Sequence, residues 1–346
     1  MARVKKLTAI LMAAVLCVSL AACGTPDRTE SNYDYMIAMI TDTGGVNDQS
    51  FNQSAWEGLK QLREDTGMKV NYIESKQMSD FVTNLDVLSD AGAKLLWAIG
   101  FTTVDAVTES AAVNPELNYA VVDNAFANPP ANVTGVTFRA QESSFMVGYI
   151  AASVSKTGKI GFIGGIENEV IRQFQYGYMA GAAYAGKKLG KEVSVSVQYA
   201  ESFSDAAKGK AIANKMYSDG CDVIYHAAGN TGQGMIEAAK ESGKWAIGVD
   251  RDQSYLAPDN VLTSALKLVS AGVEKLSKDY MDGKQIGGQN VSYGLADGAV
   301  GIPAEHPNYS DEIYNQATEI GKQISAGAIV PPSTEDEYNT YIAGLN

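Results

Sequence analysis

Short apolar runs alternate with longer amphipathic segments from residue 33 onward. Nine apolar runs have the length and continuity of buried strands, and they lie at 33–41, 68–75, 94–100, 118–125, 159–165, 192–200, 221–229, 244–252 and 260–269. Six helical segments separate them, at 52–67, 79–92, 102–114, 169–190, 206–220 and 231–243, and most end in a glycine typical of a helix C-terminus. The pattern then predicts a helix at 270–283, a β-ribbon at 287–302 and a final helix at 310–327. Continuous apolar strands between helices predict parallel sheets covered on both faces.

These elements are too many for one ordinary domain. About four strand–helix units precede residue 128 and about four follow residue 141, so each group has the usual domain size of ~100 to 150 residues. We predict two similar lobes, one from 34–138 and 266–297, the other from 139–265 and 298–346. Strands near 135–140, 261–266 and 295–300 are expected to cross between the lobes as a three-strand hinge, which suits a cleft that closes on a ligand. The alternative is one large doubly wound enzyme sheet.

The first residues have the pattern of a bacterial export signal. Basic residues at positions 3, 5 and 6 precede an apolar stretch too short for an ordinary membrane span, and small residues end it. We interpret 1–22 as a signal peptide and 23–33 as a polar tether. The end of the signal, "LAAC", resembles the lipobox of bacterial lipoproteins, so Cys23 is the expected lipidation site on an extracytoplasmic, membrane-anchored protein. An ordinary signal peptide with an incidental cysteine is the alternative.

Charge and composition narrow the classes of partner. Loss of residues 1–22 removes three positive charges and no negative ones, which moves the net charge from −13 to −16. That charge argues against nucleic acid and against adhesion to anionic headgroups, so the lipid alone is expected to hold the membrane. Cys221 is left without a partner cysteine, so no disulfide framework is expected and a large core must supply stability. With only His226 and His306, a multi-histidine metal site is excluded, and we expect no metal or other cofactor.

Ligands of parallel α/β sheets lie beyond the carboxyl ends of the strands. Here those ends carry aromatic rings, carboxylates and one ammonium group: Asp42, Asp48, Phe51, Phe101, Asp123, Asn124, Phe203, Gly229, Asp250, Asp252 and Lys267. Phe51 and Phe203 on opposite walls suit a flat ring, and carboxylates accept hydrogen bonds from sugar hydroxyls and ring N–H groups. We predict a site for a neutral, flat, hydroxyl-bearing molecule, because four carboxylates would repel a phosphorylated one.

Several of these residues also have ordinary structural interpretations. Phe51 starts an amphipathic helix and is as well suited to the core, and Phe174 lies at helical spacing from Tyr178, which favours core packing. The carboxylates Asp42 and Asp48 are typical caps of a glycine-rich turn and the helix after it. Lys267 would ordinarily be a solvated surface lysine.

The segment 39–59, "MITDTGGVNDQSFNQSAWEGL", carries a specific resemblance together with "YAVVDNA", "GFIGG", "QFQYGYMAGA", "DVIYHAAGNTGQG", "AIGVDRDQ" and "TSALK". In this order they resemble the basic membrane protein (BMP) family of bacterial lipoproteins, which are similar to purine-nucleoside receptors of ABC importers. The resemblance runs from the lipobox to about residue 330. It implies a type I periplasmic-binding-protein fold, that is, two doubly wound parallel-sheet α/β lobes joined by a three-strand hinge, with the ligand held between the lobes.

The resemblance also implies a function and a set of contacts. A purine nucleoside (inosine, guanosine or adenosine) would be captured by a monomer and delivered to an ABC permease, without enzymatic chemistry. Carried over by position, Phe51 and Phe203 are expected to sandwich the base. Asp42 and Asp123 match polar contacts from the first lobe, and Gly229, Asp250 and Lys267 match contacts near the ribose. Asp48, Ser50 and Asn52 belong to the same loop as Asp42, with no individual contact assigned.

Other functions remain to be weighed. An aspartic protease needs two aspartates in antiparallel lobes, and a phosphate loop needs a Lys-Ser/Thr after its glycines, so residues 42–48 suit neither. A nucleoside hydrolase holds calcium in an Asp-rich N-terminal loop, but this loop lacks adjacent carboxylate pairs and is a poor cage for an ion that prefers six to eight oxygens. A sensor receptor and a binding protein for a free sugar or another metabolite keep the same fold and stay open.

Overall fold

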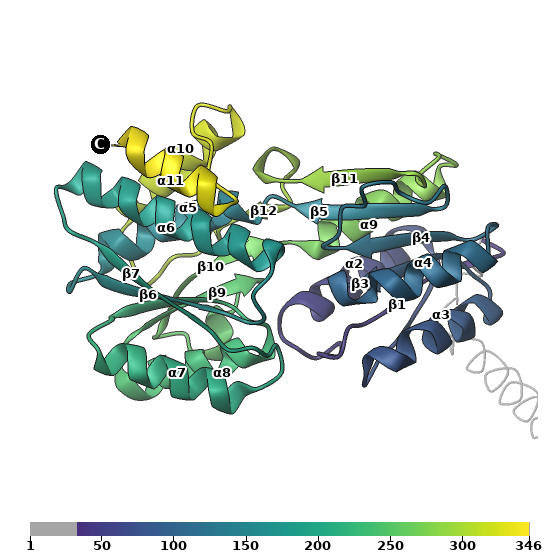
Figure 1. Ribbon diagram of the computed structural model, residues 1–346, viewed down its shortest axis with the longest axis horizontal. Coiled ribbons are helices and arrows are strands. Elements are labelled where there is room, and N and C mark those ends of the chain that lie inside the picture. Colours follow the sequence, from purple (N-terminus) through teal and green to yellow (C-terminus); the bar gives the residue numbers. More distant parts are fainter. Residues whose placement is uncertain (1–32, 346) are drawn as a thin grey trace, which may run out of the picture.

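Two six-stranded sheets form the framework of the protein in a computed structural model that describes residues 33–345 (Figure 1). The first lobe contains β1 (Met36–Ile40), β2 (Lys69–Ile73), β3 (Ala93–Ile99), β4 (Asn118–Val122), β5 (Val133–Phe138) and β11 (Gln289–Tyr293), with α2 (Phe51–Thr66), α3 (Phe81–Asp90), α4 (Val104–Val113) and α9 (Val269–Met281). The second contains β6 (Lys159–Gly164), β7 (Ser194–Tyr199), β8 (Val223–Ala227), β9 (Trp245–Asp250), β10 (Val261–Lys267) and β12 (Val300–Gly301), with α5 (Ala140–Val154), α6 (Glu169–Leu189), α7 (Ala206–Ser218), α8 (Asn230–Ser242), α10 (Asp311–Ser325) and α11 (Glu335–Leu345).

Both sheets repeat one connection pattern. The strand order is β11-β5-β4-β3-β1-β2 in the first lobe and β12-β10-β9-β8-β6-β7 in the second, and every neighbouring pair is parallel except β10 with β12. The central strands are almost wholly buried, as in β3, whereas the edge strand β7 alternates exposed with half-buried positions. The predicted α/β fold of two similar lobes is therefore confirmed.

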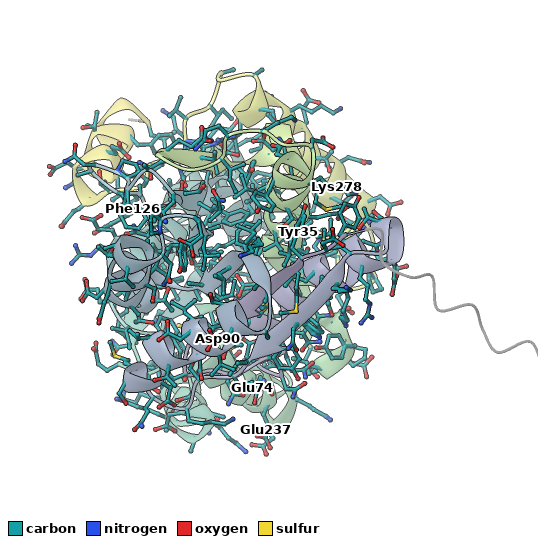
Figure 2. The ribbon with its side chains drawn as sticks, turned by 90° about the vertical axis from the view of Figure 1, so that its right-hand side faces the viewer. Tyr35, Glu74, Asp90, Phe126, Glu237 and Lys278 are labelled. Atoms are coloured by element: carbon teal, nitrogen blue, oxygen red, sulfur yellow. The ribbon has the colours of Figure 1, made fainter. Side chains whose placement is uncertain are left out.

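Helices cover both faces of each sheet, and each face has its own apolar core. In the first lobe, one core lies under α2 and α9 and the other under α3 and α4. In the second lobe, α5 and α6 cover one face while α7 and α8 cover the other. The glycines expected at helix ends close α2, α6 and α8 in the left-handed conformation, at Gly67, Gly190 and Gly243. Figure 2 faces the first lobe and shows the side chains on that end, including Tyr35, Asp90 and Lys278.

The chain passes between the lobes three times, near residues 138–140, 267–269 and 293–300. Hydrogen bonds tie these crossings together: Arg139 N donates to Tyr293 O (2.8 Å), and Leu268 N donates to Ala299 O (2.7 Å). The Arg139 guanidinium adds ion pairs to Glu142 (2.7 Å) and to Asp297 (3.2 Å). Such a short set of crossings lets two rigid lobes rotate without unfolding either sheet.

The predicted β-ribbon at 287–302 is wrong. β11 pairs in parallel with β5 in the first lobe, whereas β12 pairs antiparallel with β10 in the second. The two strands therefore belong to different sheets, and the 3₁₀ turn at Leu295–Asp297 lies between them. Both strands flank the third crossing of the hinge.

The predictions for the N-terminus concern residues that precede Tyr33. The predicted signal peptide, the lipidation at Cys23 and the tether up to residue 32 lie outside the described residues. Among residues 33–345, none of the helices combines the length and the hydropathy that a membrane crossing requires.

Candidate ligand-binding cleft

A cavity of about 230 Å³ lies between the lobes, at the carboxyl ends of the strands. It brings together nine of the ten residues expected to bind ligand: Asp42, Asp48, Phe51, Asn52, Asp123, Phe203, Gly229, Asp250 and Lys267. Ser50 is fully buried nearby but does not line the cavity. Residues that are 225 positions apart in the chain, Asp42 and Lys267, thus face one space because two sheets point their carboxyl ends at each other.

Phenylalanine rings from both lobes form walls of the cavity. Phe51 is the first residue of α2, and its ring lies beside Gly100, where an added Cβ would sit 3.5 Å from the ring. Phe203 follows β7, and its ring covers Gly165 so closely that a Cβ there would lie 2.2 Å from it. Phe174 of α6 also lines the cavity although it is only 2% exposed. Phe174 thus packs in the core, as expected, and also forms part of the cavity wall.

The loop before α2 is held by Asp48. One of its carboxylate oxygens accepts from the backbone N–H groups of Ser50 (2.9 Å) and Gln53 (3.1 Å), and the other accepts from the backbone N–H of Asn52 (2.8 Å). The Asn52 amide also bonds to Asp48 (3.0 Å) and to Asp42 (2.7 Å). Both oxygens of Asp48 are therefore engaged in starting the helix, which is the capping role that aspartate has in such loops.

Asp42 presents one oxygen to the cavity. Its Oδ1 accepts from Gly44 N (2.8 Å) and from the Asn52 amide, whereas no hydrogen bond reaches Oδ2 from the residues that the structure describes. Burial raises the pKa of the Asp42 carboxyl to about 6, against the hydrogen bonds from Gly44 and Asn52, which lower it. Oδ2 of Asp42 is therefore a buried acceptor without a donor from the described residues, so a ligand N–H or O–H would fit it.

Asp250, the last residue of β9, lines the cavity from the second lobe. The Ser50 hydroxyl of the first lobe donates to its Oδ2. Burial raises the pKa of Asp250 to about 6, while the Lys267 ammonium and the Ser50 hydroxyl act in the opposite direction. Its φ of 63° is left-handed, as is the φ of 64° at Asp123, which follows β4 at the corresponding place in the first lobe. Left-handed aspartates are uncommon and often mark functional sites.

Lys267 supplies the cavity's cation and is only 2% exposed, so the surface role considered for it does not apply. Its Nζ lies 2.5 Å from Asp123 Oδ2, and this ion pair links β10 to the first lobe. The ammonium also lies 4.6 Å from the ring centroid of Phe51 and 5.6 Å from those of Phe138 and Phe174. Aromatic faces and one carboxylate thus stabilise a charge that burial would otherwise disfavour.

Polar side chains outside the predicted set connect the lobes around the cavity. Arg251 pairs with Glu57 at 2.8 Å, Gln233 Nε2 donates to Asp48 O at 3.2 Å, and the Tyr255 hydroxyl donates to Gln49 Oε1 at 2.5 Å. These contacts show that the lobes are closed. The sequence did not predict these contacts. The only local signal was that the residues follow the ends of strands or lie in the first two turns of a helix that faces the cleft.

The arrangement of the cavity suits the binding of a ligand. Asp42, Asp123 and Asp250 each have one carboxylate oxygen without a hydrogen bond from the described residues, and phenylalanine rings line the same cavity. Residues 33–345 hold no set of three His, Cys, Asp or Glu side chains placed to share a metal ion. Acceptors between aromatic faces suit a flat ligand that carries several N–H or O–H donors.

Comparison with known proteins identifies the family and agrees with the fold. Residues 36–335 match the model of a family described as ABC transporter substrate-binding protein PnrA-like. The chain is 42% identical to basic membrane protein A of Borreliella burgdorferi, covering 88% of this chain and 90% of that protein. It is 40% identical to the ABC transporter nucleoside-binding protein BmpA of Lactococcus lactis, covering 96% and 99%. An ABC transporter solute-binding protein from Aeropyrum pernix superposes with a TM-score of 0.79 at 28% identity, covering 90% and 97%. The predicted type I periplasmic-binding-protein fold is confirmed.

Proposed function

The chain belongs to the PnrA-like family of ABC transporter substrate-binding proteins, and from that premise we propose that it captures a purine nucleoside between its lobes for delivery to an ABC permease. Proteins of this class act outside the cytoplasm. The observation that carries the proposal is the cavity itself, which is lined by Phe51 and Phe203 from opposite lobes and by carboxylates whose second oxygen has no hydrogen bond from the described residues. The name of the Lactococcus lactis relative, a nucleoside-binding protein, supports the same ligand class.

Each part of a nucleoside finds a matching group. The two phenylalanine faces stack on the flat base, and Asp42 and Asp123 accept from its N–H groups. Asp250 accepts from ribose hydroxyls, Lys267 donates to a sugar or base oxygen, and Gly229 lets the backbone approach closely at its left-handed φ of 53°. Asp48 and Asn52 hold the loop in shape, and the Ser50 hydroxyl donates a hydrogen bond to Asp250 without lining the cavity. Inosine, guanosine and adenosine all carry the required ring and hydroxyls.

The mature protein is proposed to be a monomer anchored by lipid. Cleavage after residue 22 would free Cys23 for acylation, and the tether that follows would leave the cleft free to face a permease. The acidic surface makes lipid the necessary membrane contact, because anionic headgroups repel a net charge of this sign. Mass measurement of the N-terminal peptide from membranes tests this step, since an unmodified Cys23 would contradict it.

We propose that binding is the whole activity. Release of ribose from inosine by the purified protein, measured with and without calcium, would instead indicate a hydrolase. Co-purification with a permease supports the importer role, whereas co-purification with a kinase would indicate a sensor. Stronger binding of a free sugar than of any nucleoside would move the ligand class away from nucleosides.

Substitution of the two phenylalanines tests the nucleoside proposal directly. Phe51→Ala and Phe203→Ala are each expected to weaken inosine binding by about 1 to 3 kcal/mol, as loss of base–aromatic stacking does, when measured by calorimetric titration. Phe126→Ala is the matched control, because Phe126 is half-buried, packs outside the cavity and lies on the end of the first lobe shown in Figure 2. If Phe126→Ala weakens binding as much as the other two, the sandwich is wrong.

A further inference from the structure

Gln253 is a buried glutamine that does not line the cavity but contacts both lobes. It lies three residues after Asp250 in the turn that follows β9, and its side chain is fully buried. Its backbone N–H donates to the Ser264 hydroxyl at 3.1 Å. A buried amide is favourable only when its oxygen and nitrogen both find partners, so those partners indicate what the residue does.

The amide oxygen of Gln253 holds the turn that carries Asp250. It accepts from Val249 N at 3.0 Å, where the chain leaves the sheet. The turn is tight, because Arg251 N donates back to Val249 O at 2.7 Å and Asp250 between them has a left-handed φ. Without Gln253, the buried Val249 N–H would lose its acceptor and the strained turn would lose its support. The position of the Asp250 carboxylate therefore depends on Gln253.

The Val249 N–H sets which way the amide points, and His226 pairs with that orientation. Its Nε2 lies 3.0 Å from the same Gln253 oxygen, which can only accept, so Nε2 carries the proton. The ring is fully buried and burial lowers the pKa of His226 to about 4, which keeps it neutral near neutral pH. A rotated amide would set its NH₂ group against the Val249 N–H, donor against donor. The amide nitrogen must therefore face away from His226, toward the other lobe.

The amide nitrogen reaches across the cleft. Gln253 Nε2 donates to the Gln49 carbonyl of the first lobe at 3.1 Å. Gln49 has a left-handed φ of 57° and immediately precedes Ser50 and Phe51. The Gln253 side chain thus bonds both to the turn that carries Asp250 and to the loop that precedes Phe51.

Two glycines make room for this pair. A Cβ at Gly248 would lie 2.7 Å from Gln253 Oε1, and a Cβ at Gly232 would lie 1.9 Å from His226 Nδ1. Neither distance is compatible with a side chain, so any larger residue at either position would displace the pair. The Gln253–His226 pair is therefore accommodated by the strand on one side and by the first turn of α8 on the other.

We propose that Gln253, oriented by the Val249 N–H and paired with His226, is a positioning residue that fixes Asp250 and holds the lobes closed around bound ligand. Opening of the cleft must break the bond from Gln253 to Gln49. A contact made only in the closed state slows ligand release more than it changes ligand capture. The inference rests on the proposed nucleoside function only for its probe, inosine.

Gln253→Glu tests the proposal, because it keeps an oxygen for Val249 and His226 but turns a second oxygen toward the Gln49 carbonyl. At about pH 8, where carboxylates are ionised, we expect inosine to dissociate about tenfold faster, with the association rate within about twofold of wild type. The ligand-free variant should also have a larger radius of gyration by small-angle X-ray scattering. Gln61→Glu, on the exposed side of α2, is the matched control for the added charge and should change neither quantity.

Equal dissociation rates and equal scattering for Gln253→Glu and wild type would overturn the proposal. If wild type does not bind inosine at all, the nucleoside proposal fails, and the scattering comparison alone decides the role of Gln253. Nitrogen-15 spectra of the wild-type protein decide it if the variant does not fold. A His226 tautomer with the proton on Nε2 supports the arrangement, and a proton on Nδ1 contradicts it.

Discussion

At the scale of single residues, ligand binding depends on buried carboxylates, each with one oxygen that accepts no hydrogen bond from residues 33–345. Burial raises the pKa of both Asp42 and Asp250 to about 6. Asp48 and Asp123 add repulsion to each, and Lys267 opposes the shift at Asp250. Both groups are therefore ionised at neutral pH and lose their charge just below it.

This state predicts a pH dependence of binding. Because the ionised carboxylates accept from the ligand, inosine affinity should be constant above neutral pH and fall below pH 6, by up to about tenfold per pH unit for each group. Calorimetric titration across this range measures it. Asp42→Asn, which cannot ionise, should reduce the slope, and an unchanged slope would place Asp42 outside the ligand contacts.

Acidification changes the stability of the ligand-free fold through Asp42 and Asp250 in the opposite direction to its effect on binding. A carboxyl whose pKa is raised in the folded state binds a proton more readily there than in the unfolded chain, so Asp42 and Asp250 stabilise the ligand-free fold as pH falls through 6 toward 3.8. His226, whose pKa is lowered from 6.5 to about 4, destabilises it over that descent. Loss of binding in mild acid is therefore expected without acid unfolding.

Asp250 is predicted to recognise the sugar. Asp250→Asn should weaken inosine binding by about 1 to 3 kcal/mol, because a hydrogen bond to a charged acceptor is replaced by one to a neutral group. Hypoxanthine, which lacks ribose, is the matched probe and should be affected much less. Equal losses for the two ligands would move Asp250 off the ribose.

Sequence reasoning found the cavity residues that follow strand ends and missed those that depend on lobe closure. Phe51, Phe203 and Lys267 were predictable because the carboxyl ends of parallel strands meet at one edge. Gln253 and Gln233 are ordinary polar residues in the sequence, and only the closed lobes give them partners across the cleft. Phe174 was assigned to the core because its helical spacing cannot distinguish a core face from a cavity wall.

At the scale of elements, the start of α2 couples stability to the cleft. Asp48 accepts from three backbone N–H groups there, so Asp48→Ala should lower the free energy of unfolding by about 1 to 2 kcal/mol, measured by urea denaturation. Glu64→Ala, on the exposed side of the same helix, should stay within about 0.5 kcal/mol of wild type. Similar losses in both variants would contradict the capping role.

Most elements were predictable because their burial is one-sided or complete over a recognisable length. α5 was not predicted, since it is buried on nearly all sides and so lacks a helical alternation of polar and apolar residues. The short C-terminal helix α11 has no fully buried residue and gives an equally weak signal. The ribbon error at β11 and β12 has a different cause, because strand pattern reveals neither the partner nor the sheet.

At the scale of the whole molecule, the lobes are separate bodies joined by a hinge and by polar contacts. The four apolar cores each lie within one lobe, except that Ala299 and Val300 at the hinge join a core of the first lobe. Separation of the lobes would break bonds such as Arg251 to Glu57 without exposing a core. The lobes can therefore separate without unfolding, as a receptor that must release its ligand requires.

We expect the closed cleft to hold a purine nucleoside. Native mass spectrometry of the protein purified from its own host, followed by identification of the small molecule released on denaturation, tests it without a prior choice of ligand. We predict one bound molecule with the mass of a purine nucleoside, lost in a protein that carries both Phe51→Ala and Phe203→Ala. A bound sugar, amino acid or other molecule without a purine ring would contradict it.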